Sequence, residues 1–174
     1  MKFWIKYKLA IGFILRFFGV YFVMSLLYRW YLSYYENTPD VVTKIVADVA
    51  TFFLRLVGYK VEIKNLDNEP FVRLFIGNAN VVTIVEGCNA LSVIILFITF
   101  VIAFKGKLKS TLYYLIFGFI SIYLINIIRI VLMTIGLIEI PKYRVVMHDL
   151  LFPAIIYGYV VVLWFVWVKK YANQ

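Results

Sequence analysis

The chain has 174 residues, enough for one domain; 64% of them are hydrophobic, and the mean hydropathy is +0.92. This composition excludes an ordinary soluble protein and predicts an all-α membrane protein, in which residues 1–174 form a single integral membrane domain. The net charge of +9 does not indicate nucleic-acid binding, because the basic residues flank apolar segments.

The first predicted transmembrane helix covers residues 10–31 and follows a group of lysines. Arg16 lies inside it, close enough to the inner end for the side chain to reach the polar boundary. The other end carries an aromatic belt, formed by Tyr28, Trp30, Tyr31, Tyr34 and Tyr35. Because no small-x-small cleavage site follows, we expect an uncleaved anchor rather than a signal peptide.

Residues 32–87 form the predicted outer segment, which contains two patterns. In residues 40–59 polar side chains recur every three or four positions, which is typical of an amphipathic helix on the outer leaflet or against the bundle. The alternative, a fifth span, would place the lysines of residues 105–109 outside. Residues 61–85 alternate in polarity around a glycine and asparagine turn, which predicts a small β-hairpin or sheet. This hairpin either orders the loop or offers an edge to an extended peptide.

Three further spans are predicted at about residues 88–104, 110–138 and 148–168. The segment 110–138 is longer than the ~20 residues that a bilayer requires, so it must tilt or rise above the hydrocarbon. Pro153 is expected to kink the last span near its start.

The distribution of charge predicts the orientation in the membrane. With four spans, both termini and the loop at 105–109 share one side. That side holds lysines and no carboxylate: Lys2, Lys6, Lys8, Lys105, Lys107, Lys109, Lys169 and Lys170. All nine acidic residues lie on the other side or at its boundary. The positive-inside rule therefore predicts a multi-pass protein of the cytoplasmic (inner) membrane, with both termini in the cytoplasm and residues 32–87 outside.

Three side chains of types that can take part in catalysis lie at one depth on three predicted spans: Cys88, Arg129 and His148. Cys88 and His148 are the only cysteine and histidine in the chain. At ~1.5 Å per helical residue, the three lie about 26, 30 and 32 Å above the lysines at the inner ends of their own spans. This level is near the outer boundary of the ~30 Å hydrocarbon, so we expect an active site that faces outward.

Each of these residues also has a plainer interpretation. A lone cysteine in a membrane helix is usually a small apolar filler, and His148 can be an ordinary interfacial residue. Arg129 can snorkel outward or pair with Glu86 or Asp149. Burying a guanidinium nevertheless costs a few kcal/mol at mid-bilayer and usually indicates a partner or a role. The shared depth of the three side chains favours a site.

Together these side chains can perform acyl transfer. At the first turn of its helix, Cys88 would be favoured as the thiolate by the helix dipole and a nearby guanidinium. Arg129 can bind an oxyanion, and His148 can protonate a leaving amine and then activate an acceptor. Asn89 and Asn126 can orient substrate or Arg129, since Asn126 shares a helix face with the arginine. A single cysteine excludes an internal disulfide and a cysteine-rich zinc site, so we expect no metal and no cofactor.

Three motifs resemble the exosortase/archaeosortase family: Glu86-Gly87-Cys88-Asn89-Ala90-Leu91-Ser92, Asn126-Ile127-Ile128-Arg129-Ile130 and His148-Asp149. They occur in the family's order within residues 81–164. Typical exosortases are longer and have more spans, so this chain looks like the short exosortase F-like type. The resemblance implies a membrane-embedded cysteine transpeptidase or protease with Cys88 as nucleophile and Arg129 and His148 as its partners. It also implies a membrane-anchored protein substrate whose C-terminal signal is a short motif, a hydrophobic helix and a basic tail.

Two other functions stay open at this point. A simple thiol protease would pass the acyl group to water, and the mass of the product would distinguish it from a transpeptidase. A non-enzymatic membrane scaffold or assembly subunit would use Cys88 for packing and pair Arg129 with a carboxylate. A water-accessible, reactive thiol would count against the scaffold.

Overall fold

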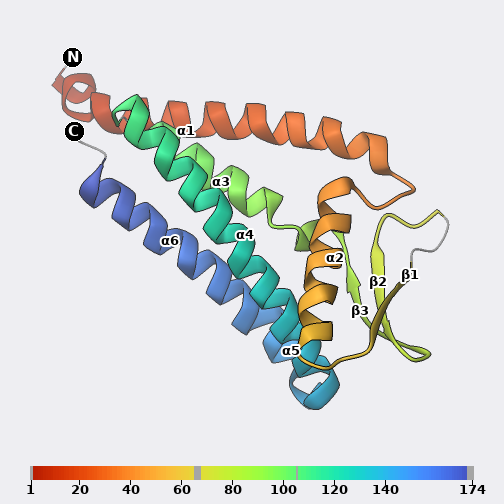
Figure 1. Cartoon of the computed structure of the whole chain (residues 1–174). Coiled ribbons are helices and arrows are strands. Elements are labelled where there is room, and N and C mark those ends of the chain that lie inside the picture. Colours follow the sequence, from red (N-terminus) through yellow and green to blue (C-terminus); the bar gives the residue numbers. More distant parts are fainter. Residues whose placement is uncertain (1, 65–67, 105, 172–174) are drawn as a thin grey trace.

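The computed structural model describes residues 2–64, 68–104 and 106–171, and its elements are mostly helices with one small sheet (Figure 1). This confirms the predicted all-α membrane class with a small β element. The helices are α1 (Lys2–Leu32), α2 (Val41–Leu56), α3 (Leu91–Ala103), α4 (Leu108–Glu139), α5 (Arg144–Val146) and α6 (Phe152–Lys170). Short 3-10 turns lie at Ser33–Tyr35, Glu86–Cys88 and Pro141–Tyr143, and a π-helical turn lies at Met147–Leu151.

Within the described residues, three helical segments are long and apolar enough to cross a membrane: Tyr7–Tyr35, Leu108–Glu139 and Pro141–Lys170. They correspond to the spans predicted at 10–31, 110–138 and 148–168. The segment predicted at 88–104 forms a helix of only 13 residues, α3. Such a helix is about 20 Å long, against ~30 Å of hydrocarbon, so the prediction of four spans is not confirmed.

The late start of α3 has a local cause. The backbone at Glu86–Cys88 forms a 3-10 turn instead of the first helical turn expected there. Ala90 then adopts a left-handed conformation, with φ of 62°. For a residue with a Cβ atom this conformation costs roughly 1–2 kcal/mol, so packing on both sides of the turn must hold it.

The helix α3 is held inside the bundle, in contact with α1, α4 and α6. The fully buried Phe97 lies against Gly118 of α4, where a Cβ atom would come within 2.1 Å of the ring. At the other end of α3, Arg16 Nη1 donates a hydrogen bond to the carbonyl of Ala103 at 3.0 Å. This arginine therefore satisfies a free carbonyl at the end of α3, where the sequence predicted a side chain that reaches the polar boundary.

The outer segment contains a three-stranded antiparallel sheet in the order β1 (Val61–Lys64), β2 (Val72–Ile76), β3 (Ala79–Ile84). The predicted hairpin is therefore present, with a further strand beside it. Leu74 of β2 pairs with Val82 and Phe75 pairs with Asn80, so Val81 is the extra residue of a β-bulge in β3.

The helix α2 covers the sheet and also contacts α4. Its inner face is fully buried at Val46, Ala47, Ala50 and Leu54. Apolar side chains on its outer surface are exposed, namely Val41, Ile45, Phe52 and Leu56. The predicted amphipathic helix is confirmed, and α2 is not among the candidate membrane spans of the described residues. An apolar outer face is what a helix at a membrane surface requires.

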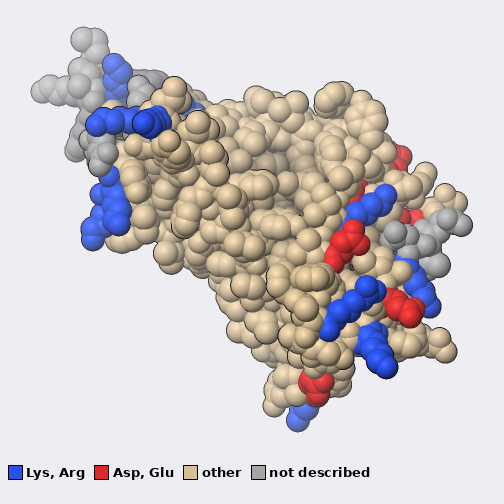
Figure 2. Space-filling view, in the orientation of Figure 1, with Lys and Arg blue, Asp and Glu red and all other residues tan. Residues whose placement is uncertain are grey.

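The two termini lie at one end of the molecule, and the sheet and α2 lie at the other (Figure 1). On the face shown in Figure 2, acidic side chains appear only toward the end that holds the sheet. At the end that holds the termini the charged side chains in view are basic. This separation agrees with the distribution of charge from which the orientation was predicted.

Candidate functional site

The turn that carries Cys88 joins the sheet to the helical bundle. Val85 continues β3 in an extended conformation, and the N–H of Cys88 donates a hydrogen bond back to its carbonyl at 2.8 Å. The thiol is half-buried, beside the apolar cluster formed by α2, the sheet and α4. Cys88 precedes α3 by three residues, whereas the sequence placed it in the first turn of that helix. The helix dipole therefore acts on the thiol less directly than expected.

Asn126 connects Cys88 to Arg129. Its Nδ2 donates a hydrogen bond to the backbone carbonyl of Cys88 at 2.8 Å, and its Oδ1 accepts one from Arg129 Nη1 at 3.3 Å. The amide is fully buried. Arg129 also holds a buried Nε without a hydrogen-bond partner in the described part of the chain. A guanidinium with an unused donor, linked through one amide to the backbone of the cysteine, is suited to bind an oxygen that becomes negative.

Neither carboxylate expected as a partner of Arg129 lies within ion-pair distance of it. Asp149 contacts His148 instead, with 2.6 Å between Oδ1 and Nδ1. Glu86 accepts a hydrogen bond from the hydroxyl of Tyr28 at 2.7 Å. Within the described residues, the polar partner of Arg129 is Asn126.

Asn89 acts on the backbone of the same turn. Its side chain is almost fully buried, and its Oδ1 accepts a hydrogen bond from the N–H of Leu91 at 2.9 Å, which satisfies a free donor at the start of α3. Its Nδ2 donates to Thr43 Oγ1 at 3.2 Å. The hydroxyl of Thr43 in turn donates to Asp40. Asn89 is thus placed to orient the turn, and its amide is already occupied by protein groups.

Three residues that hold this turn were not singled out from the sequence: Tyr28, Asp40 and Thr43. Asp40 is buried, caps the N-terminus of α2 and also accepts a hydrogen bond from Tyr31 Oη at 3.3 Å. Its position immediately before an apolar periodic segment is a capping signal that the sequence carries. Nothing local indicates that Tyr28 of the first span meets Glu86, because the two are 58 positions apart.

His148 lies in the π-helical turn between α5 and α6, and its side chain is 55% exposed. Met147, the preceding residue, is buried against Gly136 of α4, which fixes the turn to the end of that helix. Turns of this kind occur mostly as single insertions in helices and are frequent at functional sites. The sequence predicted His148 at the start of the last span. In the structure it lies in the turn that immediately precedes α6.

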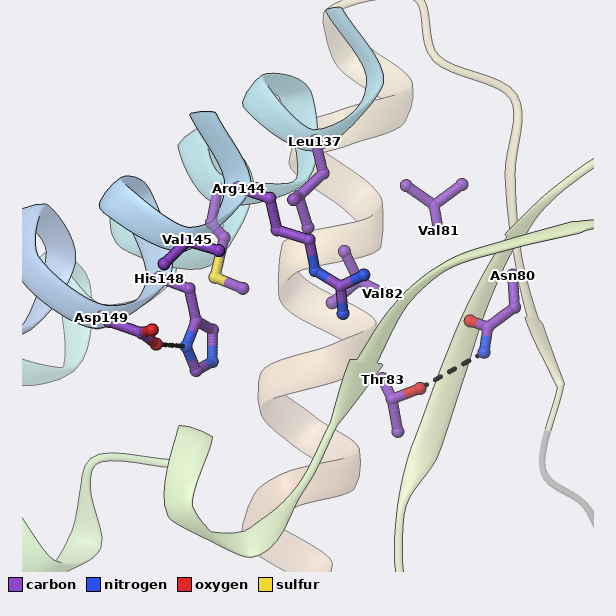
Figure 3. Close-up of a pocket in the computed structure, with 10 residues that line it drawn as sticks. Asn80, Val81, Val82, Thr83, Leu137, Arg144, Val145, His148 and Asp149 are labelled. Atoms are coloured by element: carbon purple, nitrogen blue, oxygen red, sulfur yellow. Dashed lines mark hydrogen bonds and ion pairs between the residues drawn. The ribbon is translucent and has the colours of Figure 1, made fainter. Parts of the chain in front are cut away.

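A cavity of about 510 Å³ lies beside His148, between β3 and the helical wall formed by α4, α5 and the π-helical turn. Figure 3 shows Arg144 pointing from the helical wall toward the strand and the imidazole of His148 projecting into the space below it. Arg144 was missed in the sequence, although it precedes His148 by four positions, the spacing of one helix face. Cys88 and Arg129 do not line this cavity.

The structure thus joins four of the five predicted site residues into one region and places the fifth apart. Cys88, Asn89, Asn126 and Arg129 surround the turn between β3 and α3. His148 has no hydrogen bond to any of them within the described residues, and its partner is Asp149. The strand β3 connects the two places, because it lines the cavity of His148 and leads to Cys88.

Comparison with known proteins identifies a family for the chain. A family model described as transmembrane exosortase matches residues 9–168, which include every residue of the candidate site. No curated protein and no solved structure matches the chain significantly.

Proposed function

The chain belongs to the transmembrane exosortase family, and we propose that it is a membrane-embedded cysteine transpeptidase or protease. Its substrates would be exported, membrane-anchored proteins with a C-terminal motif, a hydrophobic helix and a basic tail. One observation besides the family supports this most strongly. Asn126 ties the backbone of the only cysteine to a partly buried arginine, which is the pairing that a thiolate and a developing oxyanion require.

In the first half of the proposed reaction, the thiolate of Cys88 attacks the carbonyl carbon of the scissile peptide bond and forms a C–S bond. Arg129 stabilises the negative charge on the carbonyl oxygen. The C–N bond then breaks, and the leaving amine takes a proton from His148. The products are a thioester on Cys88 and the released C-terminal tail.

In the second half, an acceptor attacks the thioester while His148 takes up its proton. The C–S bond breaks, and Cys88 returns to the thiolate. An amine or hydroxyl acceptor gives transpeptidation, and water gives hydrolysis. His148 serves this cycle from the cavity beside β3, where its exposed ring can exchange protons with water.

The proposed orientation puts both termini in the cytoplasm and the sheet, α2 and Cys88 at the outer face of the cytoplasmic membrane. The basic end and the mixed-charge end seen in Figure 2 support it. A substrate would be cut close to the bilayer, between its exported part and its membrane helix.

The alternative is a non-enzymatic scaffold, which the half-buried packing of Cys88 favours. That function would leave Arg129 to pair with a carboxylate, yet its partner among the described residues is Asn126.

The deciding experiment co-expresses the chain with an exported protein that carries such a tail and is encoded beside it. Mass spectrometry of the exported protein should show a product shortened at its C-terminus, with added mass if an acceptor was joined. The Cys88→Ala variant, at equal membrane abundance, should give none. Full processing by that variant would leave the scaffold as the better hypothesis.

A further inference from the structure

A groove runs along β3 beside the candidate site. The cavity of about 510 Å³ next to His148 shares Asn80, Val81, Leu137 and Arg144 with a second cavity of about 380 Å³ that extends to Pro141. Both volumes fall within the ~300–1,000 Å³ typical of ligand-binding pockets. One wall of this groove is β3, and the other is formed by the end of α4 and by α5 (Figure 3).

The strand presents its edge to the groove. β3 is the last strand of the sheet and, among the described strands, pairs only with β2. Four consecutive residues, Asn80 to Thr83, line the cavity. Beyond the bulge, alternate side chains of the strand point to opposite faces, so the cavity that Val82 and Thr83 both line borders the main chain between them. Such an edge is a template for an added strand.

The same strand leads to the thiol. The bulge at Val81 interrupts regular pairing, and the carbonyl of Val85 is already hydrogen-bonded within the turn, so the usable edge is Val82–Ile84. Val85 keeps an extended backbone, with φ of −100° and ψ of 168°, and the turn that ends at Cys88 follows at once. A peptide paired with this edge would reach Cys88 without changing direction.

We propose that this edge is the substrate-binding site. The segment that precedes the scissile bond binds in the groove as a short strand paired with Val82–Ile84. This inference rests on the proposed function and specifies how its substrate is held. Arg144 supports it, because it lines both cavities and its side chain makes no hydrogen bond or ion pair within the described part of the chain. Its guanidinium N–H groups are free to donate to main-chain carbonyls of the substrate.

The direction of the added strand follows from the proposed orientation. β3 starts at Ala79, in the cavity that reaches Pro141 near the end of α4, and runs toward Cys88 and the bundle. A substrate chain with its exported part outside and its helix in the membrane runs the same way from N to C. The substrate strand is therefore parallel to β3.

Disulfide cross-linking tests both the site and the direction. The Cys88→Ala variant is free of cysteine, and a single cysteine is placed at Thr83 or at Asn80. The partner is the co-expressed exported protein with its C-terminal tail, which carries single cysteines along the segment before the cut. Thr83→Cys should cross-link nearest the cut. Asn80→Cys lies beyond the bulge but in the same groove, so it should cross-link at positions farther toward the N-terminus, because a parallel strand keeps the order of positions along β3.

Glu62 is the matched control, since it is exposed on β1, the opposite edge of the same sheet. Glu62→Cys should give no cross-link. Processing by the wild-type chain is measured in parallel on the same substrate. If processing occurs but the β3 positions cross-link no more than Glu62→Cys, or in the reverse order, this proposal is wrong while the function stands. If the wild type processes nothing, the proposed function fails, and the substrate site falls with it.

Discussion

The side chain of Asn126 lies 2.8 Å from the backbone carbonyl of Cys88 and donates a hydrogen bond to it. The same amide accepts a hydrogen bond from Arg129. Because an asparagine carries its donor and its acceptor on one planar group, this contact fixes the guanidinium relative to the turn of the thiol. The cysteine and the arginine come from separate elements, and one buried side chain links them.

The proposed catalytic roles of Cys88, Arg129 and His148 can be tested with conservative changes. Cys88→Ala should abolish processing, and Cys88→Ser should be nearly as damaging, since a neutral hydroxyl is a far poorer nucleophile than a thiolate. Arg129→Lys should fail because an ammonium lacks the planar fork of donors. His148→Ala should lower turnover less severely, since water can carry a proton at an exposed site. Product formation is measured beside membrane abundance, and full processing by Cys88→Ala would contradict the thiol mechanism.

Replacing Asn126 should separate the thiol from the arginine. Asn126→Ala is expected to lower processing at least tenfold, which corresponds to about 1.4 kcal/mol in the barrier. Asn126→Asp keeps an acceptor for Arg129 but loses the donor to the Cys88 carbonyl, so it should restore little activity. Thr134→Val is a matched control, because within the described part of the chain this buried hydroxyl on α4 bonds only to the carbonyl of Ile130 in its own helix. If Asn126→Ala processes substrate as well as the control does, the link is structural only.

Helical periodicity was sufficient to predict that Asn126 and Arg129 share a face, and the hydrogen bond between them confirms it. The link from Asn126 to Cys88 joins residues 38 positions apart. No period or motif spacing carries that information, since it depends on how α4 packs beside the turn. The family resemblance, by contrast, rested on short motifs and is confirmed over nearly the whole chain.

Two of the departures from the prediction have physical causes that the sequence does not show. Hydropathy cannot place the start of α3, because Cys88 and Ala90 are as compatible with an apolar helix as with the turn that they form. The polar side chains that recur every three or four positions in residues 40–59 were expected on a helix face apart from the apolar side chains, yet two of them, Asp40 and Thr51, are buried. Packing of α2 on the sheet and on α4 buries both residues. The hydrogen-bond partners of each polar atom then show which of the two supports the turn at Cys88.

Two buried threonines on α2 provide a matched test of how the site is supported. Thr43 donates to Asp40 and accepts from Asn89, whereas the hydroxyl of Thr51 is buried without a partner among the described residues. Thr43→Val leaves two buried polar groups unsatisfied, at about 1–3 kcal/mol each. Thr51→Val removes an unsatisfied group and should be neutral or stabilising.

The measurements are thermal unfolding in detergent and the rate at which maleimide modifies Cys88, which is the only thiol. Thr43→Val should lower the melting temperature and change the modification rate, and Thr43→Ser should restore both. Equal effects from Thr43→Val and Thr51→Val would show that the chain from Asp40 to Asn89 does not hold the turn.

Close packing of α3 on α4 predicts an unequal response of two helical glycines. Gly118→Ala places a Cβ atom within 2.1 Å of the buried Phe97 ring, and overpacking of this kind typically costs about 1–3 kcal/mol. At Gly19 of α1 an added Cβ atom would meet nothing within 4 Å, so Gly19→Ala should be neutral or slightly stabilising through helix propensity. Melting temperatures of the two variants in one detergent decide the matter, and a stable Gly118→Ala would contradict the packing of α3.

The orientation in the membrane can be tested with an impermeant thiol reagent in the Cys88→Ala background. Asn78 lies in the turn between β2 and β3, and Lys107 lies between α3 and α4, toward the basic end of the molecule. Because basic loops stay in the cytoplasm, Asn78→Cys should be labelled in intact cells and Lys107→Cys only after permeabilisation.

The labelling test also decides whether α3 crosses the membrane. A helix of 13 residues can cross only with the help of its neighbours or of local thinning of the bilayer. Labelling of both Asn78→Cys and Lys107→Cys from outside would mean that α3 does not cross, and labelling of Lys107→Cys alone would mean that the orientation is inverted. The side of the membrane on which Cys88 acts would then have to be assigned again.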